Sequence, residues 1–254
     1  NRLHKSLSKV GKRIEAMRNQ LSIMEKEDFS SELLISYYTI LFQEEKNAKQ
    51  GLTELSKLVK EAEFRDNILV AIVLNFFFAW DLRLLIKIKK WKNNYSAHVL
   101  EWEDIVYEME GLISGANFRF NFKENTTVPQ LTKSSNGEIK LINLGHPIIP
   151  LKKLVSNDFN LAPTEQFAIV TGPNMAGKST FLRSIGVNLM LARAGFHVMA
   201  SEFIFPDMKL YSSMRTSDDL KDETSYFHAE LLRLRFIVDA IERGEQVFII
   251  LDEI

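Results

Sequence analysis

The sequence contains no cysteine and only five histidines in 254 residues. The lack of cysteine excludes a disulfide framework and a thiolate metal site, and it agrees with a reducing compartment. The histidines show no spacing typical of metal ligands, so we predict no histidine metal site. Because no signal peptide is recognisable either, we predict a cytoplasmic protein.

Long hydrophobic runs and an excess of one charge are also missing. The most apolar uncharged stretch runs only from Asn67 to Trp80, whereas a membrane-spanning helix needs about 20 residues, so we expect a buried helix and no membrane segment. The 32 Lys and Arg nearly balance the 33 Asp and Glu, which argues against a basic nucleic-acid surface over the whole molecule. One local basic group is a candidate for DNA-phosphate contact, or alternatively a solvated helix end: Lys87, Lys89, Lys90 and Lys92.

The length and composition set the scale of the fold. A chain of 254 residues with 46% apolar side chains can bury one large core or two smaller ones, which predicts a folded protein. The first residue is Asn1 and not methionine, and we expect the chain to continue beyond both of its ends.

The N-terminal half is predicted to be helical. Apolar residues recur at steps of three and four from Leu3 to Met24, the spacing of a coiled-coil seam, and a second periodic segment runs from Leu34 to Ala62. These two segments predict an antiparallel helical hairpin that protrudes as an arm, in preference to a compact bundle. A third helix is expected from Arg65 to Lys92 and a fourth from about residue 98 to residue 116.

The character of the sequence then changes, so we place a domain boundary between residues 116 and 117. Short alternating or apolar runs predict strands at FRFNF (118–122), GEIKLINLGHP (137–147), QFAIVTG (166–172) and QVFIILDE (246–253). Helical patterns follow from Lys178 to Ala194 and from Ser225 to Ile241. Strands that alternate with helices predict a parallel α/β sheet with crossover helices for residues 117–254.

A phosphate-binding loop is predicted where one of these strands meets the following helix. Gly172, four further residues, then Gly177, Lys178 and Ser179 match G-x-x-x-x-G-K-[ST]. The glycines allow backbone N–H groups to approach phosphate oxygens, and the helix N-terminus adds a partial positive charge. Lys178 is expected to reach the β- and γ-phosphates, and Ser179 to ligate Mg²⁺.

An acidic pair ends the last predicted strand. Asp252 is expected to hold the Mg²⁺ ion, and Glu253 to act as the catalytic base that polarises the attacking water. An Asn-Lys-x-Asp element, which commonly reads guanine, is absent from the sequence, so ATP is the expected nucleotide. Taken alone, the pair could also be a strand that ends in solvated acids.

Several segments share their residues and their order with one family. The loop TGPNMAGKST contains a distinctive Pro-Asn-Met, and GHP (145–147), SNDFNL (156–161) and LDEI (251–254) occur around it in the family's order. A further segment, DDLKDETSYFHAEL, is similar to a family motif whose positions here are Asp218, Asp219, Leu220, Ser225, Phe227 and Glu230. Over about residues 140–254 the sequence therefore resembles the MutS family of DNA mismatch-repair ATPases.

The resemblance implies an α/β P-loop NTPase domain of the ATP-binding-cassette type, preceded by an all-α arm. Such domains dimerise around two ATP molecules, with Ser225 on the γ-phosphate bound by the partner subunit and Asn174 on that of its own. A helix N-cap is the competing role for Ser225. The adenine is expected near Leu154 and Asn157. The nucleotide-binding loop comprises Gly172, Pro173, Asn174, Met175, Ala176, Gly177, Lys178, Ser179 and Thr180.

We therefore predict a Mg²⁺-dependent ATPase, with catalytic Glu253, Lys178 and Ser225, that couples homodimerisation to a helical arm and acts on double-stranded DNA. The alternative is a nucleotide-gated interaction module without turnover. A P-loop kinase is disfavoured because no arginine-rich lid follows the loop.

Two elements of the family pattern are missing from this sequence. Phe42-Gln43-Glu44 matches the letters of the family's mismatch-reading Phe-x-Glu wedge, but we expect Phe42 to be a packing residue in the middle of a helix. The segments that complete the family's catalytic site follow the position of Ile254. Residues 1–254 alone are therefore expected to lack a complete hydrolytic site.

Overall fold

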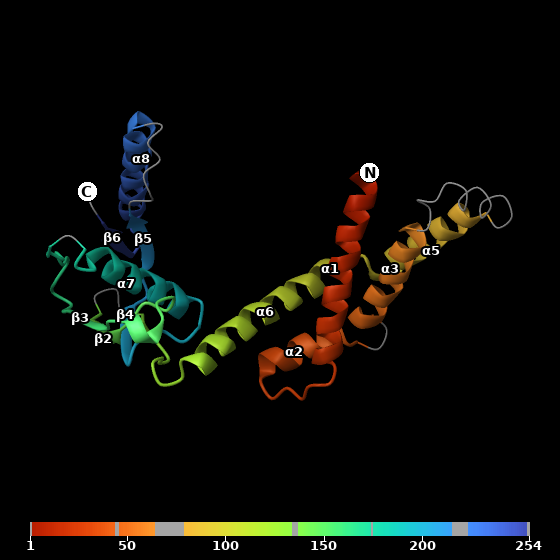
Figure 1. Cartoon of the computed structure of the whole chain (residues 1–254), viewed down its shortest axis with the longest axis horizontal. Coiled ribbons are helices and arrows are strands. Elements are labelled where there is room, and N and C mark those ends of the chain that lie inside the picture. Colours follow the sequence, from red (N-terminus) through yellow and green to blue (C-terminus); the bar gives the residue numbers. More distant parts are fainter. Residues whose placement is uncertain are drawn as a thin grey trace. The chain divides into compact units, whose positions relative to one another are not determined.

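The computed structural model describes residues 2–43, 46–63, 79–133, 137–173, 175–214 and 223–252 (Figure 1). The chain divides into two compact units, Asn1–Ile113 and Ser114–Ile254, and each is described by itself. The boundary that we predicted, between residues 116 and 117, lies slightly C-terminal to this division. Both positions fall inside helix α6 (Val99–Asn121), so no change of secondary structure marks the boundary.

Helices make up the first unit wherever the structure describes it. They are α1 (Arg2–Met24), α2 (Glu32–Leu41), α3 (Ala48–Glu63), α5 (Trp80–Tyr95) and the first part of α6. Helix α1 packs against α3, and α3 packs against α5 (Figure 1). The apolar seam predicted for α1 is confirmed in its second half, where Ile14, Met17 and Leu21 are buried.

A single core joins these helices. Leu21 of α1, Leu41 of α2, Leu52 of α3 and Trp102 of α6 belong to one buried cluster, and Trp102 is only 1% exposed. Helix α3 approaches Trp102 closely because Gly51 has no side chain, and a Cβ there would lie 3.0 Å from the indole ring. The prediction of an antiparallel hairpin in preference to a bundle was therefore wrong in part: α1 does pack against α3 of the second predicted segment, but both helices share their core with α2 and α6.

Two of the predicted helices are interrupted. The periodic segment 34–62 is divided between α2 and α3, and Phe42 caps the C-terminus of α2 instead of lying mid-helix. Phe42 does pack against the helical core, as expected. In the predicted helix 65–92, Ala79 has a φ of 46° and precedes the start of α5, so a single helix does not run through it. Positive φ is unfavourable for alanine and incompatible with continued α-helix.

The apolar stretch predicted as a buried helix, 67–80, lies mostly outside the described residues. Among the helices that the structure does describe, none combines the length and the hydropathy needed to cross a bilayer. In the basic group on α5, Lys87 forms an ion pair with Glu61 at 2.9 Å, and Lys92 lies in the last turn of the helix. There a cation complements the partial negative charge of the helix C-terminus.

The second unit contains a mixed four-stranded sheet and a parallel strand pair. The sheet has the order β1-β4-β2-β3, with β1 parallel to β4 and β2 antiparallel to both of its neighbours. Its strands are β1 (Gln130–Thr132), β2 (Ile139–Leu144), β3 (Asn157–Leu161) and β4 (Glu202–Pro206). The pair is formed by β5 (Lys209–Ser213) and β6 (Val247–Leu251), which are joined through α8 (Glu223–Glu242).

This topology confirms part of the predicted α/β sheet and corrects the rest. The predicted strands around 139–144 and 247–251 are present, and so are α7 (Lys178–Arg193) and α8. The strands β5 and β6 form a parallel pair on either side of a helix, which agrees with the predicted parallel crossover, although we predicted no strand at the position of β5. The four-stranded sheet is not parallel, because β2 runs antiparallel to β3 and β4.

Helix α7 packs on the sheet through its apolar face. Ile185 and Leu189 of α7 belong to the same buried cluster as Leu141 of β2 and Phe203 and Phe205 of β4. A fully buried side chain of this size contributes about 1.5–3 kcal/mol relative to an exposed one. This core therefore holds α7, which starts at the phosphate-binding loop, against the sheet.

Two predicted strands are not formed. Residues 118–122 end helix α6, where the rings of Phe118 and Phe122 lie 5.3 Å apart across one helical turn. An alternation of apolar and polar residues over only five positions is a weak indication of a strand when a helix directly precedes it. Residues 166–172 have no assigned strand, and the side chains of Phe167 and Ile169 are 77% and 76% exposed. Among the described strands none pairs with this segment, and a strand requires a hydrogen-bonded neighbour.

Candidate nucleotide-binding site

The predicted phosphate loop leads directly into α7. Gly177 is the N-cap residue with φ 88° and ψ 12°, a left-handed conformation that glycine adopts without strain. Helix α7 begins at Lys178, and Phe181 donates the first helical hydrogen bond to the Gly177 carbonyl at 2.9 Å. The N–H groups of the first helical turn have no partner within the helix, which makes this end of α7 a potential anion site.

The tip of the loop is open to solvent. Met175 has a φ of 64° and is fully exposed. The Ala176 N–H bonds to the Pro173 carbonyl at 3.3 Å and closes a turn, and Gly172 and Thr180 at the two ends of the loop are exposed as well. The predicted loop residues therefore form one accessible turn. Asn174 lies outside the described residues.

The side chain of Lys178 folds back over the loop. Its Nζ lies 2.7 Å from the Gly172 carbonyl oxygen and 3.1 Å from that of Pro173. The ammonium group is thus held at the loop by two carbonyl acceptors, without a carboxylate partner in the described part of the chain. A phosphate that binds at the loop could therefore pair with the Lys178 ammonium group without first breaking an ion pair.

Ser179 and Asp252 come together at the junction of α7 and β6. The Ser179 hydroxyl donates a hydrogen bond to Asp252 Oδ1 at 3.0 Å. Asp252 follows the last residue of β6, and its own N–H bonds to the Ser213 carbonyl at the end of β5. The parallel pair β5–β6 therefore delivers the carboxylate to the start of α7, as the sequence motifs predicted.

The oxygen atoms of Ser179 and Asp252 suit a hard cation. Magnesium is commonly bound through one or two carboxylates together with phosphate oxygens and water, and does not need a cage of protein ligands. Among the described residues no group of three or more His, Cys, Asp or Glu side chains could hold a metal. The pair fits a Mg²⁺ ion that arrives with a nucleotide, and the role of both residues as ligands stays a prediction.

The residues predicted near the adenine lie in a different segment. Leu154 ends the short 3-10 helix η2 (Leu151–Lys153) and packs on Gly145, where an added Cβ would lie 2.8 Å from a Leu154 methyl carbon. Asn157 opens β3, and its amide donates to the Val155 carbonyl at 3.4 Å. Both side chains are thus placed by local contacts, and their role as base contacts stays a prediction.

Two of the predicted catalytic groups cannot be placed. Glu253 lies outside the described residues, and so do Asp218, Asp219 and Leu220 of the family-like segment. Helix α8 begins at Glu223, so Ser225 lies in its first turn and the alternative role as N-cap was wrong. The side chain of Ser225 is not among those described.

Asn188 and His146 were not predicted as part of this region. Asn188 of α7 is fully buried and bonds to backbone groups at Gly145 and Met199. Burial lowers the pKa of His146 below its usual value, and the nearby Arg183 guanidinium lowers it further. A polar residue on the apolar face of α7, four residues after Ser184, was the available signal for Asn188.

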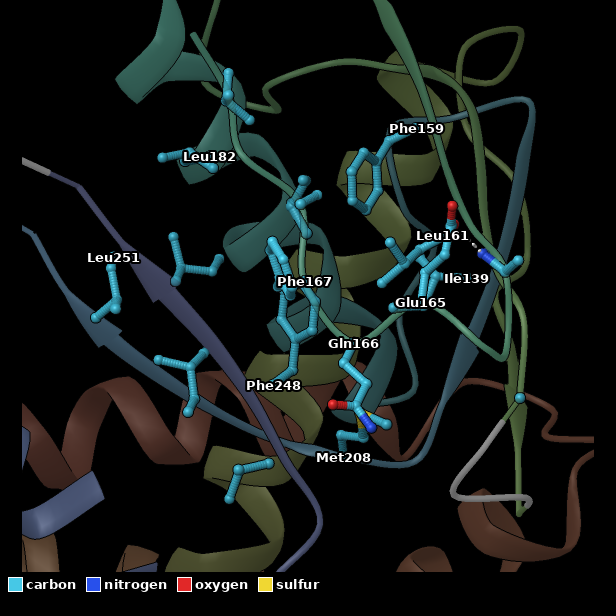
Figure 2. A pocket seen from close by; sticks show the side chains of 18 of the residues that line it. Ile139, Phe159, Leu161, Glu165, Gln166, Phe167, Leu182, Met208, Phe248 and Leu251 are labelled. Carbon is cyan, nitrogen blue, oxygen red and sulfur yellow. Dashed lines mark hydrogen bonds between the residues drawn. The ribbon is translucent and has the colours of Figure 1, made fainter. Parts of the chain in front are cut away.

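An apolar cavity of about 730 Å³ lies beside the site but does not include it (Figure 2). Figure 2 shows Phe159, Phe167, Leu182 and Phe248 around it. Glu165 is the single carboxylate among the described residues that line it, and it accepts a hydrogen bond from the Ala162 N–H. Lys178, Ser179 and Asp252 are not among these lining residues, most of which are apolar.

Comparison with known proteins agrees with the resemblance read from the motifs. Residues 168–254 match the family model of MutS domain V. The DNA mismatch repair protein MutS of Pseudothermotoga lettingae is 35% identical over 124 residues, which are 48% of this chain and 15% of that protein. MutS of Rickettsia typhi is 34% identical over 154 residues, 58% of this chain and 17% of the relative.

A second kind of relative is also similar. The Endonuclease MutS2 of Thermotoga neapolitana is 30% identical over 155 residues, which are 59% of this chain and 19% of that protein. Each of these matches thus covers less than a fifth of the relative's length. The part that matches the model of MutS domain V includes the phosphate loop and β6, because both lie within residues 168–254.

Proposed function

Because the chain belongs to the MutS family, whose ATPase domain V matches residues 168–254, we propose that it binds ATP and Mg²⁺ at the start of α7 and hydrolyses the nucleotide. The triphosphate lies on the loop 172–177 and the N-terminus of α7. Lys178 exchanges its two loop carbonyls for phosphate oxygens. Ser179 and Asp252 would hold a Mg²⁺ ion, which would supply positive charge against the negative charge that develops during phosphoryl transfer.

The hydrogen bond between Ser179 and Asp252 is the observation that carries this proposal. A serine at the start of a helix and an aspartate at the end of a parallel strand meet at 3.0 Å, beside a lysine that has no carboxylate partner among the described residues. A structural serine could bond to its own helix instead, as Ser184 does with the Thr180 carbonyl. The arrangement supports a cation site adjoining a phosphate site.

Hydrolysis requires a base for the attacking water, and we assign that role to Glu253. It directly follows Asp252, so its backbone starts at the proposed metal site. A second copy of the chain supplies Ser225 to the γ-phosphate, and Asn174 contacts the γ-phosphate in its own subunit. In this proposal two ATP molecules lie between two ATPase domains, and their binding and hydrolysis move the helical unit on double-stranded DNA.

The test is Mg²⁺·ATP binding and turnover by the natural full-length protein. Lys178→Ala is expected to weaken ATP binding by at least tenfold, because the phosphates lose the nearest protein cation. Lys123→Ala, which removes an exposed lysine of the same unit, is the matched control and is expected to change affinity less than twofold. Affinity within threefold of the wild type in Lys178→Ala would show that the phosphate site is elsewhere.

Turnover separates the ATPase from the alternative of a nucleotide-gated interaction module. The steady-state rate of phosphate release is measured over a range of protein concentrations, because a site shared between two subunits gains specific activity as the dimer forms. Tight ATP binding with no release above the background of Lys178→Ala would favour the gated module.

A further inference from the structure

Asn188 is a buried amide whose hydrogen bonds join three parts of the second unit. Its side chain is 0% exposed. The Nδ2 group donates to the carbonyls of Gly145 and Ser184, each at 2.8 Å, and Oδ1 accepts from the Met199 N–H at 2.7 Å. Both amide hydrogens and the carbonyl oxygen are therefore used, which offsets the cost of burying a polar group.

The amide lies between two backbone segments, one that follows β2 at Gly145 and one that precedes β4 at Met199. After the paired residues Ile142 and Glu202, the two segments stay side by side, and the Gly145 N–H donates to the Met199 carbonyl at 2.8 Å. At a hydrogen-bonded position of an antiparallel pair, the two facing residues exchange two such bonds. The return bond is replaced here, because the Met199 N–H and the Gly145 carbonyl both bond to Asn188.

This contact fixes α7 along its axis. Asn188 lies ten residues after Lys178, about 15 Å along the helix at 1.5 Å per residue. Apolar contacts alone permit small sliding of a helix on a sheet, whereas two directional hydrogen bonds from Asn188 to backbone outside α7 define one position. The start of α7, with Lys178 and Ser179, is therefore held at a set distance from the backbone at Gly145, which follows β2.

The backbone at Gly145 also contacts the segment proposed to hold the base. An added Cβ on Gly145 would lie 2.8 Å from a methyl carbon of Leu154 and 3.0 Å from the Met199 side chain. The Leu154 side chain therefore lies directly against the Gly145 backbone. Asn188 consequently links the helix that carries the phosphate-binding groups to the segment 154–157.

We propose that Asn188 is a positioning residue for the nucleotide: it fixes the spacing between the phosphate-binding end of α7 and the segment that contacts the base. This inference rests on the proposed function of the site. It assigns to Asn188 no contact with the nucleotide. Asn188 is expected to increase the affinity for ligands that contact both the phosphate end and the base end of the site. The affinity for a ligand that contacts only the phosphate end is expected to depend less on Asn188.

The first experiment compares two ligands in the full-length protein. Asn188→Leu preserves the approximate volume but leaves the Met199 N–H and the Gly145 carbonyl without their partner. We expect its affinity for Mg²⁺·ATP, measured by isothermal titration calorimetry, to fall at least tenfold, while the affinity for Mg²⁺·tripolyphosphate falls less than threefold. Ser184→Ala is the matched control, because it removes a buried hydrogen bond that stays within α7, and both affinities are expected to stay within twofold.

The second experiment keeps the shape of the side chain but replaces the amide by a carboxyl group, whose charge changes with pH. In Asn188→Asp an ionised carboxylate still accepts from Met199 but repels the carbonyls of Gly145 and Ser184. Burial beside two carbonyl oxygens favours the protonated form, which can donate to one of them. The ATP affinity relative to the wild type is therefore expected to rise at least threefold when the pH is lowered from 8 to 6.

The neighbouring histidines do not reproduce this pH dependence. Burial lowers the pKa of both histidines. The Arg183 guanidinium lowers the pKa of His146 further, and the Arg119 guanidinium lowers the pKa of His197 further. Both imidazoles are consequently neutral over most of this pH range. The wild type measured at each pH removes any effect they share with the variant. The elements that meet at Asn188 also carry Lys178, Arg183 and Arg193 on α7, Lys140 on β2 and Glu202 on β4. Lys140 and Glu202 form an ion pair with each other.

The outcomes distinguish the inference from the function beneath it. If the wild type binds neither ligand, the proposed nucleotide site itself fails. If the wild type binds both and Asn188→Leu loses equal factors for ATP and tripolyphosphate, Asn188 is merely structural and the inference is overturned. If Asn188→Leu does not fold, Asn188→Asp is the deciding variant. A loss of ATP affinity relative to the wild type that is the same at pH 8 and at pH 6 would then overturn the inference.

Discussion

Ser179 at the first turn of α7 donates a hydrogen bond to Asp252 after the end of β6, and 3.0 Å separate the two oxygens. Ser179 belongs to the phosphate loop, whereas Asp252 directly follows β6, a strand that the chain forms only after β4, β5 and α8. The packing of α7 against the sheet and the parallel pairing of β5 with β6 are both needed for this meeting. The Ser179–Asp252 hydrogen bond therefore depends on both of these tertiary contacts. Its two oxygen atoms mark the position where we expect a metal ion to bind.

The first prediction tests the metal site through Asp252→Asn. The amide oxygen can still accept from the Ser179 hydroxyl, so the link between α7 and β6 persists while the negative charge is lost. We expect the gain in ATP affinity on adding Mg²⁺ to fall at least tenfold, whereas ATP affinity in EDTA changes less than threefold. Titration calorimetry with and without Mg²⁺ measures both values.

Asp207→Asn is the control for this prediction. Asp207 is an exposed carboxylate of the same unit that lies 3.8 Å from Arg193 and away from the loop. Its substitution is expected to leave the Mg²⁺ dependence unchanged. Full Mg²⁺ dependence in Asp252→Asn would assign the metal to other ligands.

The second prediction concerns the proposed base. Glu253→Gln in the full-length protein is expected to retain ATP affinity within about threefold, because we assign the metal and phosphate contacts to Lys178, Ser179 and Asp252. The single-turnover hydrolysis rate is expected to fall by a factor of about 10²–10⁴, the usual contribution of a general base. A parallel loss of binding and hydrolysis would instead make Glu253 a structural residue.

Local sequence was sufficient to predict the parts of the site whose geometry is local. The glycines before Lys178 predict a loop that enters a helix, and the apolar run before Asp252 predicts a strand end. Each feature is determined by residues that are neighbours in the sequence. Their meeting at Ser179 and Asp252 was inferred from the motif pair, and the structure brings these two side chains together.

The features that sequence did not predict depend on distant partners. Asn188 bonds to backbone groups of Gly145 and Met199, which are 43 and 11 residues away in the chain and belong to other elements. The run at 166–172 is apolar enough for a strand, but a strand also needs a neighbour, and none of the described strands pairs with it. Similarly, Phe118–Phe122 alternates as a strand would, yet it continues a helix that begins at Val99.

The third prediction compares two glycines of α6. A methyl group on Gly111 meets nothing within 4 Å, so Gly111→Ala is expected to raise the free energy of unfolding by about 0.5–1 kcal/mol through better helix propensity. A methyl group on Gly115 would lie 2.3 Å from the ring of Phe196, so Gly115→Ala is expected to lower it by about 1–3 kcal/mol through overpacking.

Urea denaturation of the two variants, followed by circular dichroism, measures both changes. The same substitution in the same helix is its own matched control, so only the surroundings differ. Equal stabilisation by both alanines would show that Phe196 moves aside at little cost, and that Gly115 is not required for the contact.

The last prediction follows from Glu245, which joins the α8–β6 turn to the start of β5. Hydrogen bonds from Lys209, then Tyr211 and then Arg243, lower the pKa of Glu245 from 4.5 to about 2. A carboxyl group whose pKa is lower in the folded state stabilises the fold above its unfolded pKa, and this stabilisation is lost as the pH falls from 4.5 towards 2. Glu245→Gln cannot ionise, so the pH dependence of its urea midpoint is expected to be shallower than that of the wild type in this window. Glu242→Gln, an exposed acid at the end of α8, is the control, and equal slopes for wild type and Glu245→Gln would remove Glu245 from the acid response.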